Sequence, residues 1–230
     1  MFLSLALALC APADPAPQAG KPVPQVEAAP RYYMILFGGQ SVPFVPRTAH
    51  TFGTFVKATP DATGALSLEH VTISWLPESG PVQPLRIRSV PGHNYTLEET
   101  FAIAAKNNAR MSMWGPFEID AGRYCAAAAQ AATLESGAVR FRSLDSLGRN
   151  RRVQHCVHAL TFADPKLQSL SQPVLKVGEP GTAKLAIKYA ESGAFASTET
   201  HEWLVSALGL DKQPVVVRRA LGEQVPRQWK

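Results

Sequence analysis

Residues 31–39 read RYYMILFGG, in which an arginine is followed by an apolar and aromatic run that ends at two glycines. A short run of this kind, closed by glycine, predicts a strand buried in the interior of the protein. Residues 50–58, HTFGTFVKA, have strand composition as well, and the turn-forming residues 60–64 separate them from residues 68–76, LEHVTISWL. The sequence therefore predicts a hairpin over residues 50–76 in the same sheet as residues 31–37.

Apolar and polar side chains alternate through residues 68–76. Because successive side chains of a strand point to opposite faces, Val71, Ile73 and Trp75 are expected on one face of the sheet. The polar side chains of His70, Thr72 and Ser74 are expected on the other face.

Helical and strand signals are mixed along the rest of the chain, which favours an α+β fold with an antiparallel sheet. Thr96 is predicted to cap a helix that runs to about residue 107, and Asp120 a second helix that ends before Gly137. Further helices are expected from Cys156 onward, at residues 183–192 and at 199–208, and further strands at 111–119, 139–143 and 215–218. The Cys156 helix is expected to pack beside the sheet.

The N-terminus has the pattern of a secretion signal. Residues 2–9 are apolar, and Ala11-Pro12-Ala13 has the small-x-small form of a signal-peptidase site. We therefore expect residues 1–13 to be a signal peptide, too short to span a membrane, and residues 14–30 to be a Pro/Ala-rich tether. Residues 31–230 are expected to form one domain, with a core over 31–163 and a C-terminal elaboration over 164–230. The predicted location is periplasmic, in the cell envelope or extracellular.

The overall composition is that of a globular protein, with 46% hydrophobic and 18% charged residues and a net charge of +5. Five arginines between residues 140 and 152 are opposed there only by Asp145. Without a nucleic-acid-binding motif or interleaved aromatic residues, this cluster does not predict a nucleic-acid partner. It suits either an acidic substrate or a solvated loop.

Cys156 lies between His155 and His158 and allows four interpretations: a nucleophile, half of a disulfide, an inert core thiol or a metal ligand. Removal of Cys10 with the leader leaves Cys125 and Cys156, which could pair in an oxidising compartment. A zinc site is chemically allowed, but its four candidate ligands lack the short paired spacing of zinc motifs. These candidates are His50, His70, Cys156 and His155. No metal and no cofactor are therefore predicted.

A nucleophilic role for Cys156 has three supports in the sequence. The predicted helix start and the arginines at positions 149, 151 and 152 would favour a thiolate. His50, at the start of a strand, could act as the base, and His70 on the next strand could orient it. Glu69 replaces His70 in that role if the register is shifted by one residue. Trp114, before Gly115-Pro116, is either a wall of the substrate cleft or a core residue.

His50 in AHTFGTF, His70 in EHVTISW and Cys156 in QHCVHAL resemble the circularly permuted branch of the papain-like, NlpC-type thiol hydrolases. In that branch the histidine precedes the polar residue and the cysteine. A permuted bacterial family of unknown function also has this order, with Asn where this chain has His155. The resemblance covers about residues 31–163.

The resemblance implies an exported thiol hydrolase or acyltransferase that acts on an amide or ester of a peptide, protein or lipid, including cell-wall peptide. The helix N-terminal amides would stabilise the oxyanion. The alternative is a non-enzymatic binding or structural domain with a Cys125–Cys156 disulfide.

Overall fold

A computed structural model of the protein describes residues 29–144, 152–168, 177–213 and 215–225. Its central sheet has five strands in the order β3-β2-β1-β6-β9, and all neighbours except β6 and β9 are antiparallel. The strands are β1 (Arg31–Ser41), β2 (His50–Pro60), β3 (Leu66–Ile73), β6 (Ala109–Ile119) and β9 (Val216–Arg219). The predicted α+β class and the hairpin of β2 and β3 are confirmed.

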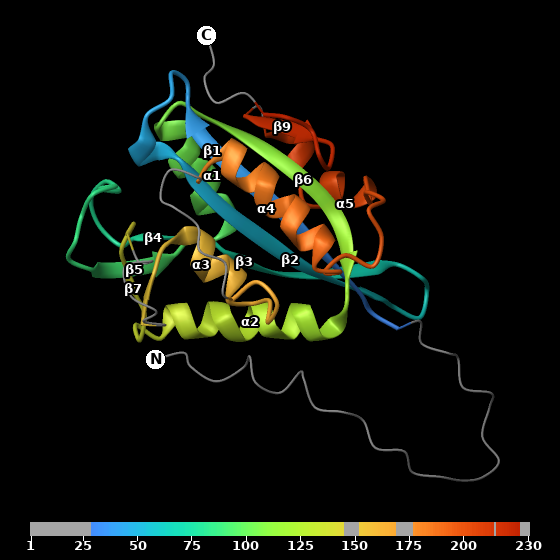
Figure 1. The fold of residues 1–230 in the computed structure, drawn as a ribbon. Helices are drawn as coiled ribbons and strands as arrows, with labels where there is room; N and C mark the ends of the chain where they lie inside the picture. Colours follow the sequence, from blue (N-terminus) through green and yellow to red (C-terminus); the bar gives the residue numbers. More distant parts are fainter. Residues whose placement is uncertain (1–28, 145–151, 169–176, 214, 226–230) are drawn as a thin grey trace, which may run out of the picture.

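Helices cover both faces of this sheet (Figure 1). We call one side the α3 face, because α2 (Ala121–Glu135), α3 (Cys156–Thr161) and α4 (Glu179–Glu191) pack there. The other side is the α1 face, which α1 (Leu97–Lys106) and α5 (Trp203–Ala207) cover. Thr96 caps α1 in a capping box with Glu99, as its sequence predicts.

The buried strand β1 supplies side chains to both faces. Phe37 stacks on Phe52 on the α1 face, with their ring centroids 4.7 Å apart, whereas Leu36 belongs to the core on the α3 face. Gly53 of β2 lets α3 come close, because a side chain at this position would meet Leu160 at 2.8 Å. The Cys156 helix therefore packs beside the sheet, as expected.

A second, smaller sheet joins the hairpin to the segment that precedes Cys156. It contains β4 (Trp75–Pro77), β5 (Val90–Asn94), β7 (Arg140–Phe141) and β8 (Val153–Gln154) in that order. The indole N–H of Trp75 donates to the Gln154 carbonyl at 3.1 Å. This contact holds the start of α3 against the end of the hairpin.

Several predicted boundaries were wrong. The strand over 68–76 breaks at Ser74 into β3 and β4, and the strand over 139–143 is reduced to the two residues of β7. The helix predicted at 183–192 begins at Glu179, and the one predicted at 199–208 spans only Trp203–Ala207. Short 3₁₀ helices occur at Pro46–Thr48 (η1) and Leu210–Lys212 (η4).

The predicted signal peptide and all but the last two residues of the predicted tether lie outside the described residues. No helix within the described part of the chain combines the length and the apolar character that crossing a bilayer requires.

Candidate functional site

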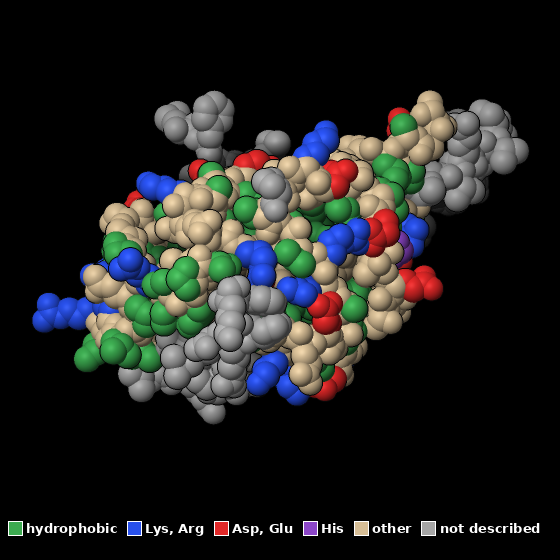
Figure 2. Space-filling model, turned by 90° about the horizontal axis from the view of Figure 1, so that it is seen from above, with side chains coloured by type: hydrophobic (Ala, Val, Ile, Leu, Met, Phe, Trp, Pro, Cys, Tyr) green, Lys and Arg blue, Asp and Glu red, His purple; other side chains and the backbone are tan. Residues whose placement is uncertain are grey.

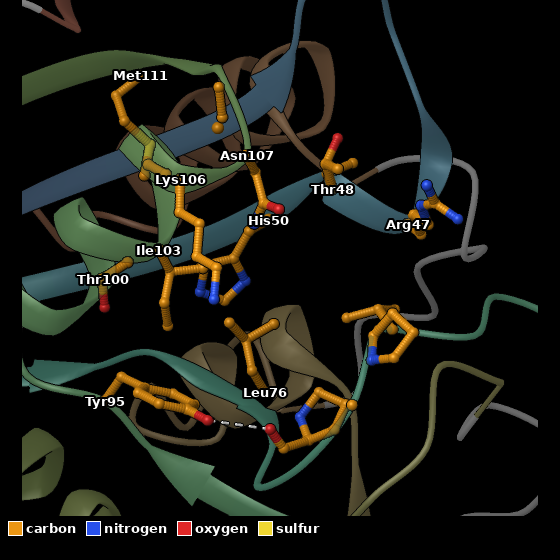
Figure 3. A pocket seen from close by; sticks show the side chains of 18 residues that line it. Arg47, Thr48, His50, Leu76, Tyr95, Thr100, Ile103, Lys106, Asn107 and Met111 are labelled. Carbon is orange, nitrogen blue, oxygen red and sulfur yellow. Dashed lines mark hydrogen bonds between the residues drawn. The ribbon is translucent and has the colours of Figure 1, made fainter.

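Two cavities adjoin at the end of the sheet where β2 begins. The larger, about 420 Å³, is lined by His50 and is called the histidine cavity (Figure 3). The smaller, about 90 Å³, is lined by Cys156 and is called the thiol cavity. Ala49, Leu76 and Val82 contribute to the walls of both. The two residues singled out by the sequence thus lie in neighbouring cavities that share a wall.

His50 is the first residue of β2 and is only 6% exposed. Its ring stacks on Phe52, two residues along the same face, with centroids 5.4 Å apart. The Nε2 atom is 2.9 Å from Ser74 Oγ, whereas Nδ1 has no hydrogen-bond partner among the described residues. One ring nitrogen is therefore fixed, and the other keeps an unused hydrogen-bonding capacity in the wall of the histidine cavity.

Ser74 is held in place from both sides. Its backbone N–H donates to Asn94 Oδ1 at 2.9 Å, and its Oγ is 2.8 Å from Thr100 Oγ1. The Thr100 hydroxyl also reaches the Thr96 carbonyl at 2.7 Å, which ties the chain of hydroxyl groups to the first turn of α1. Ser74 lies at the break between β3 and β4, and its side chain points to the same face of the hairpin as that of His50.

Burial lowers the pKa of His50 to about 3, because the charged imidazolium would lose its hydration. The imidazole is therefore neutral at neutral pH. Cys156 and His50 accordingly do not start as a preformed thiolate–imidazolium pair in this structure, and no hydrogen bond joins these two described residues.

The lowered pKa predicts that His50 weakens the fold in acid. In the unfolded chain the histidine binds a proton below about pH 6.5, whereas in the folded protein His50 binds one only below about pH 3. The folded protein therefore has its full stability above about pH 6.5 and loses stability as the pH falls towards about 3. Each pH unit in that window costs about 1.4 kcal/mol. Between pH 7 and 4.5, urea unfolding should show about 2–3 kcal/mol more loss for the wild type than for His50→Gln. Equal losses would contradict the burial of a neutral imidazole.

Cys156 is the first residue of α3 and is 5% exposed. Its sulfur is a thiol and not part of a disulfide. The Cys125–Cys156 disulfide considered from the sequence is therefore absent, and this alternative for Cys156 was wrong. The thiol faces a mainly apolar cavity wall that includes Phe44, Phe141 and Val177.

His155 caps α3 with its side chain. Its Nδ1 accepts the backbone N–H groups of Val157 at 3.0 Å and His158 at 3.4 Å, and its ring stacks on that of His158. These are the N-terminal amides that the sequence-based mechanism assigned to the oxyanion. That assignment was wrong for these two amides, because His155 already occupies them.

His70 does not contact His50, so the predicted orienting role is not seen. His70 is exposed on β3 and lies opposite Val56, six residues along β2 from His50, or roughly 20 Å at about 3.3 Å per residue. The competing residue, Glu69, bonds Lys57 at 2.9 Å. The two strand histidines are also too far apart to share a metal, and no metal-binding cluster of His, Cys, Asp and Glu occurs within the described segments.

Trp114 is a core residue rather than a wall of a cleft. It is 0% exposed and packs in the core on the α3 face. Gly115 follows with a φ of +91°, and a side chain there would come within 2.9 Å of the Met34 carbonyl. The Gly-Pro break therefore accommodates neighbouring backbone and does not expose the indole.

Two arginines of the basic cluster, Arg140 and Arg142, bind backbone next to the small sheet. Arg140 donates to the Ser89 carbonyl at 3.1 Å, and Arg142 donates to the Ile87 carbonyl at 3.2 Å. Arg149 and Arg151 lie outside the described residues, so their predicted effect on the thiol stays a prediction.

Ser143 is a further candidate that the sequence did not suggest. It lines the thiol cavity with Cys156, is 6% exposed, and its Oγ has no hydrogen-bond partner in the described part of the chain. Nothing in the sequence around it distinguishes this serine from an ordinary turn residue. A buried hydroxyl without a hydrogen-bond partner is uncommon in folded proteins, which singles out Ser143 as a candidate.

Comparison with known proteins gives no independent guide to the site. No family model matches the chain, and no match was found among the curated proteins or the solved structures.

Proposed function

We propose that the protein is a thiol hydrolase or acyltransferase in which Cys156 attacks the carbonyl carbon of an amide or ester. The observation that carries the proposal is the state of His50. It is buried, held through Nε2 by Ser74 and unpartnered at Nδ1, and its cavity shares a wall with that of the Cys156 thiol. A base fixed through one nitrogen by a third group is the arrangement that nucleophilic catalysis needs.

In the proposed mechanism Ser74 takes the orienting role that the sequence gave to His70. The His50 tautomer with a proton on Nε2 donates to Ser74 Oγ and leaves the lone pair on Nδ1. Because His50 lies on the α1 face of the sheet and Cys156 on the α3 face, Nδ1 accepts the Cys156 proton through a bridging water as the sulfur attacks. This water lies at the wall that the two cavities share. The proton returns to the leaving group by the same route when the carbonyl re-forms. The products of the first step are a Cys156 thioester and the released amine or alcohol, and water or another acceptor then takes the acyl group.

The fold and the chain order support the same proposal. His50, Ser74 and Cys156 follow one another in the order of the permuted papain-like thiol hydrolases, and α3 packs on β2 at Gly53. We propose this permuted core as the finer fold assignment. The apolar leader supports export, and with it a peptide, protein or lipid of the cell envelope as the acyl donor.

The proposal is tested by ester hydrolysis with two matched histidine variants. His50→Gln should lower the turnover of p-nitrophenyl butyrate by about a hundredfold or more, since general-base catalysis contributes about 10²–10⁴ in rate. His70→Gln, on the same side of the hairpin but exposed, should behave as the wild type. Equal activity of His50→Gln and the wild type would exclude His50 as the base.

The proposed oxyanion donor is the Ser143 hydroxyl. Ser143→Ala should lower kcat by about a hundredfold with little change in KM, because one such donor is commonly worth about 10²–10³ in rate. Ser143→Thr keeps a hydroxyl and should retain more activity than Ser143→Ala. If both variants turn over the ester at the wild-type rate, the oxyanion is stabilised elsewhere.

A second candidate function is a non-enzymatic binding domain. The observations that favour it are the engaged amides of Val157 and His158 and the missing hydrogen bond between Cys156 and His50. This candidate predicts no turnover in any variant while the histidine cavity still binds a ligand.

A further inference from the structure

The histidine cavity carries cations that no acidic side chain of the described residues neutralises. Arg47 from η1 and Lys106 from the last turn of α1 line it, and no Asp or Glu occurs among its lining residues. Neither cation forms an ion pair with any residue in the described segments. On the face seen from above in Figure 2, basic and acidic side chains both occur and are largely interspersed. The cavity is thus a local site of uncompensated positive charge.

The polar groups of the cavity are arranged by depth. Arg47 and Lys106 are exposed, whereas His50 is more than nine-tenths buried and offers its unpartnered Nδ1. Figure 3 shows the Lys106 side chain reaching into the cavity on the side of His50, with Arg47 at the other end of the view. Between them the lining is partly apolar and includes Leu76, Ile103 and Met111.

We infer that the histidine cavity binds a small molecule or chain end that carries an oxyanion, a carboxylate or a phosphate. The oxyanion lies in the cavity between Arg47 and Lys106, which attract it from opposite ends, and a polar group of the same ligand reaches His50 Nδ1. The guanidinium fork of Arg47 suits either anion, and the Lys106 ammonium adds a second positive charge. A volume of about 420 Å³ is in the usual range of small-molecule sites.

This inference also names the substrate class, and that part of it rests on the proposed function. The reacting amide or ester would lie by the wall of Ala49 and Leu76, between His50 and Cys156, and its anionic end would extend to the two cations. An acyl donor with a free carboxylate or phosphate is then preferred over a neutral one of equal length.

Binding is tested by titration calorimetry on the whole chain, with glutarate and inorganic phosphate as probes and the neutral glutaramide as control. Glutarate or phosphate should bind, and glutaramide should not. Arg47→Gln and Lys106→Gln should each weaken binding by about tenfold, the size expected for loss of one charge-assisted bond. Lys184 is an exposed lysine on α4, outside the cavity. The control variant Lys184→Gln removes the same charge there and should leave binding unchanged.

The relative affinities for glutarate and phosphate tell which oxyanion the site prefers. The inference is overturned if neither anion binds at millimolar concentration, if glutaramide binds as well as glutarate, or if Arg47→Gln and Lys106→Gln bind like the wild type.

The substrate part has its own measurement. The p-nitrophenyl monoester of glutarate should have a lower KM than the valerate ester, and Lys106→Gln should raise only the KM of the glutarate ester. Anion binding without any ester turnover contradicts the proposed function and leaves the anion site standing. Turnover with equal KM values for both esters contradicts the anionic substrate and leaves the thiol mechanism standing.

Discussion

Replacing Cys156 by alanine is expected to lower kcat/KM for ester hydrolysis by at least about a thousandfold, because in the proposed mechanism Cys156 forms the covalent intermediate. The fold should survive, since the change removes only one sulfur atom at the start of α3 and leaves the His155 cap intact. The measurement is the initial rate with p-nitrophenyl butyrate beside the midpoint of urea unfolding. A Cys156→Ala protein that is folded and keeps its activity within about tenfold would rule out the thiol as nucleophile.

Replacing Glu179 by alanine is expected to cost about 3–5 kcal/mol of stability. This carboxylate is 0% exposed in the first turn of α4, and Arg110 donates to both of its oxygens at 3.0 and 2.8 Å. Ser112 donates to it at 2.6 Å and in turn accepts from Arg219 at 3.1 Å. These hydrogen bonds connect α4 to β6 and β9. Removing the Glu179 carboxylate takes away the negative charge that faces the partly buried Arg110 guanidinium.

Two variants make the Glu179 result interpretable, each followed by urea unfolding. Arg31→Ala breaks the exposed pair with Glu118 and should cost no more than about 1 kcal/mol. The double change Glu179→Leu with Arg110→Leu should cost less than Glu179→Ala alone, because it removes both charges together. A loss below about 1 kcal/mol for Glu179→Ala would show that the buried group does not hold α4 to the sheet.

The architecture could be predicted from the sequence where hydrophobic periodicity is strong. The runs that became β1, β2 and β6, and the caps Thr96 and Asp120, were placed correctly. The strand β5, of sequence VPGHN, was missed because its proline and glycine have the composition of a turn, and β8 has only two residues. The start of α4 was missed because Pro180 and Gly181 have the composition of a loop, although they lie in the first turn of the helix that begins at Glu179.

The site was predicted only in part, because it depends on the register between strands. Alternation placed His70 and Ser74 on one face of the hairpin, but it cannot tell which of them meets His50. The observed register pairs His70 with Val56 and leaves Ser74 at the break, within 2.9 Å of His50. The His155 cap could have been anticipated from its place before the predicted helix. Ser143 could not, since its role depends on a cavity formed by distant segments.

The central claim is that Cys156 carries the acyl group and that His50 activates the Cys156 thiol. The most direct test is the mass of the intact protein, quenched shortly after mixing with p-nitrophenyl butyrate, followed by mapping of the modified peptide. The account predicts one butyryl group on Cys156 in the wild type, none on Cys156→Ala, and much slower acylation in His50→Gln than in His70→Gln. Acylation at a residue other than Cys156, or at the same rate in both histidine variants, would contradict it.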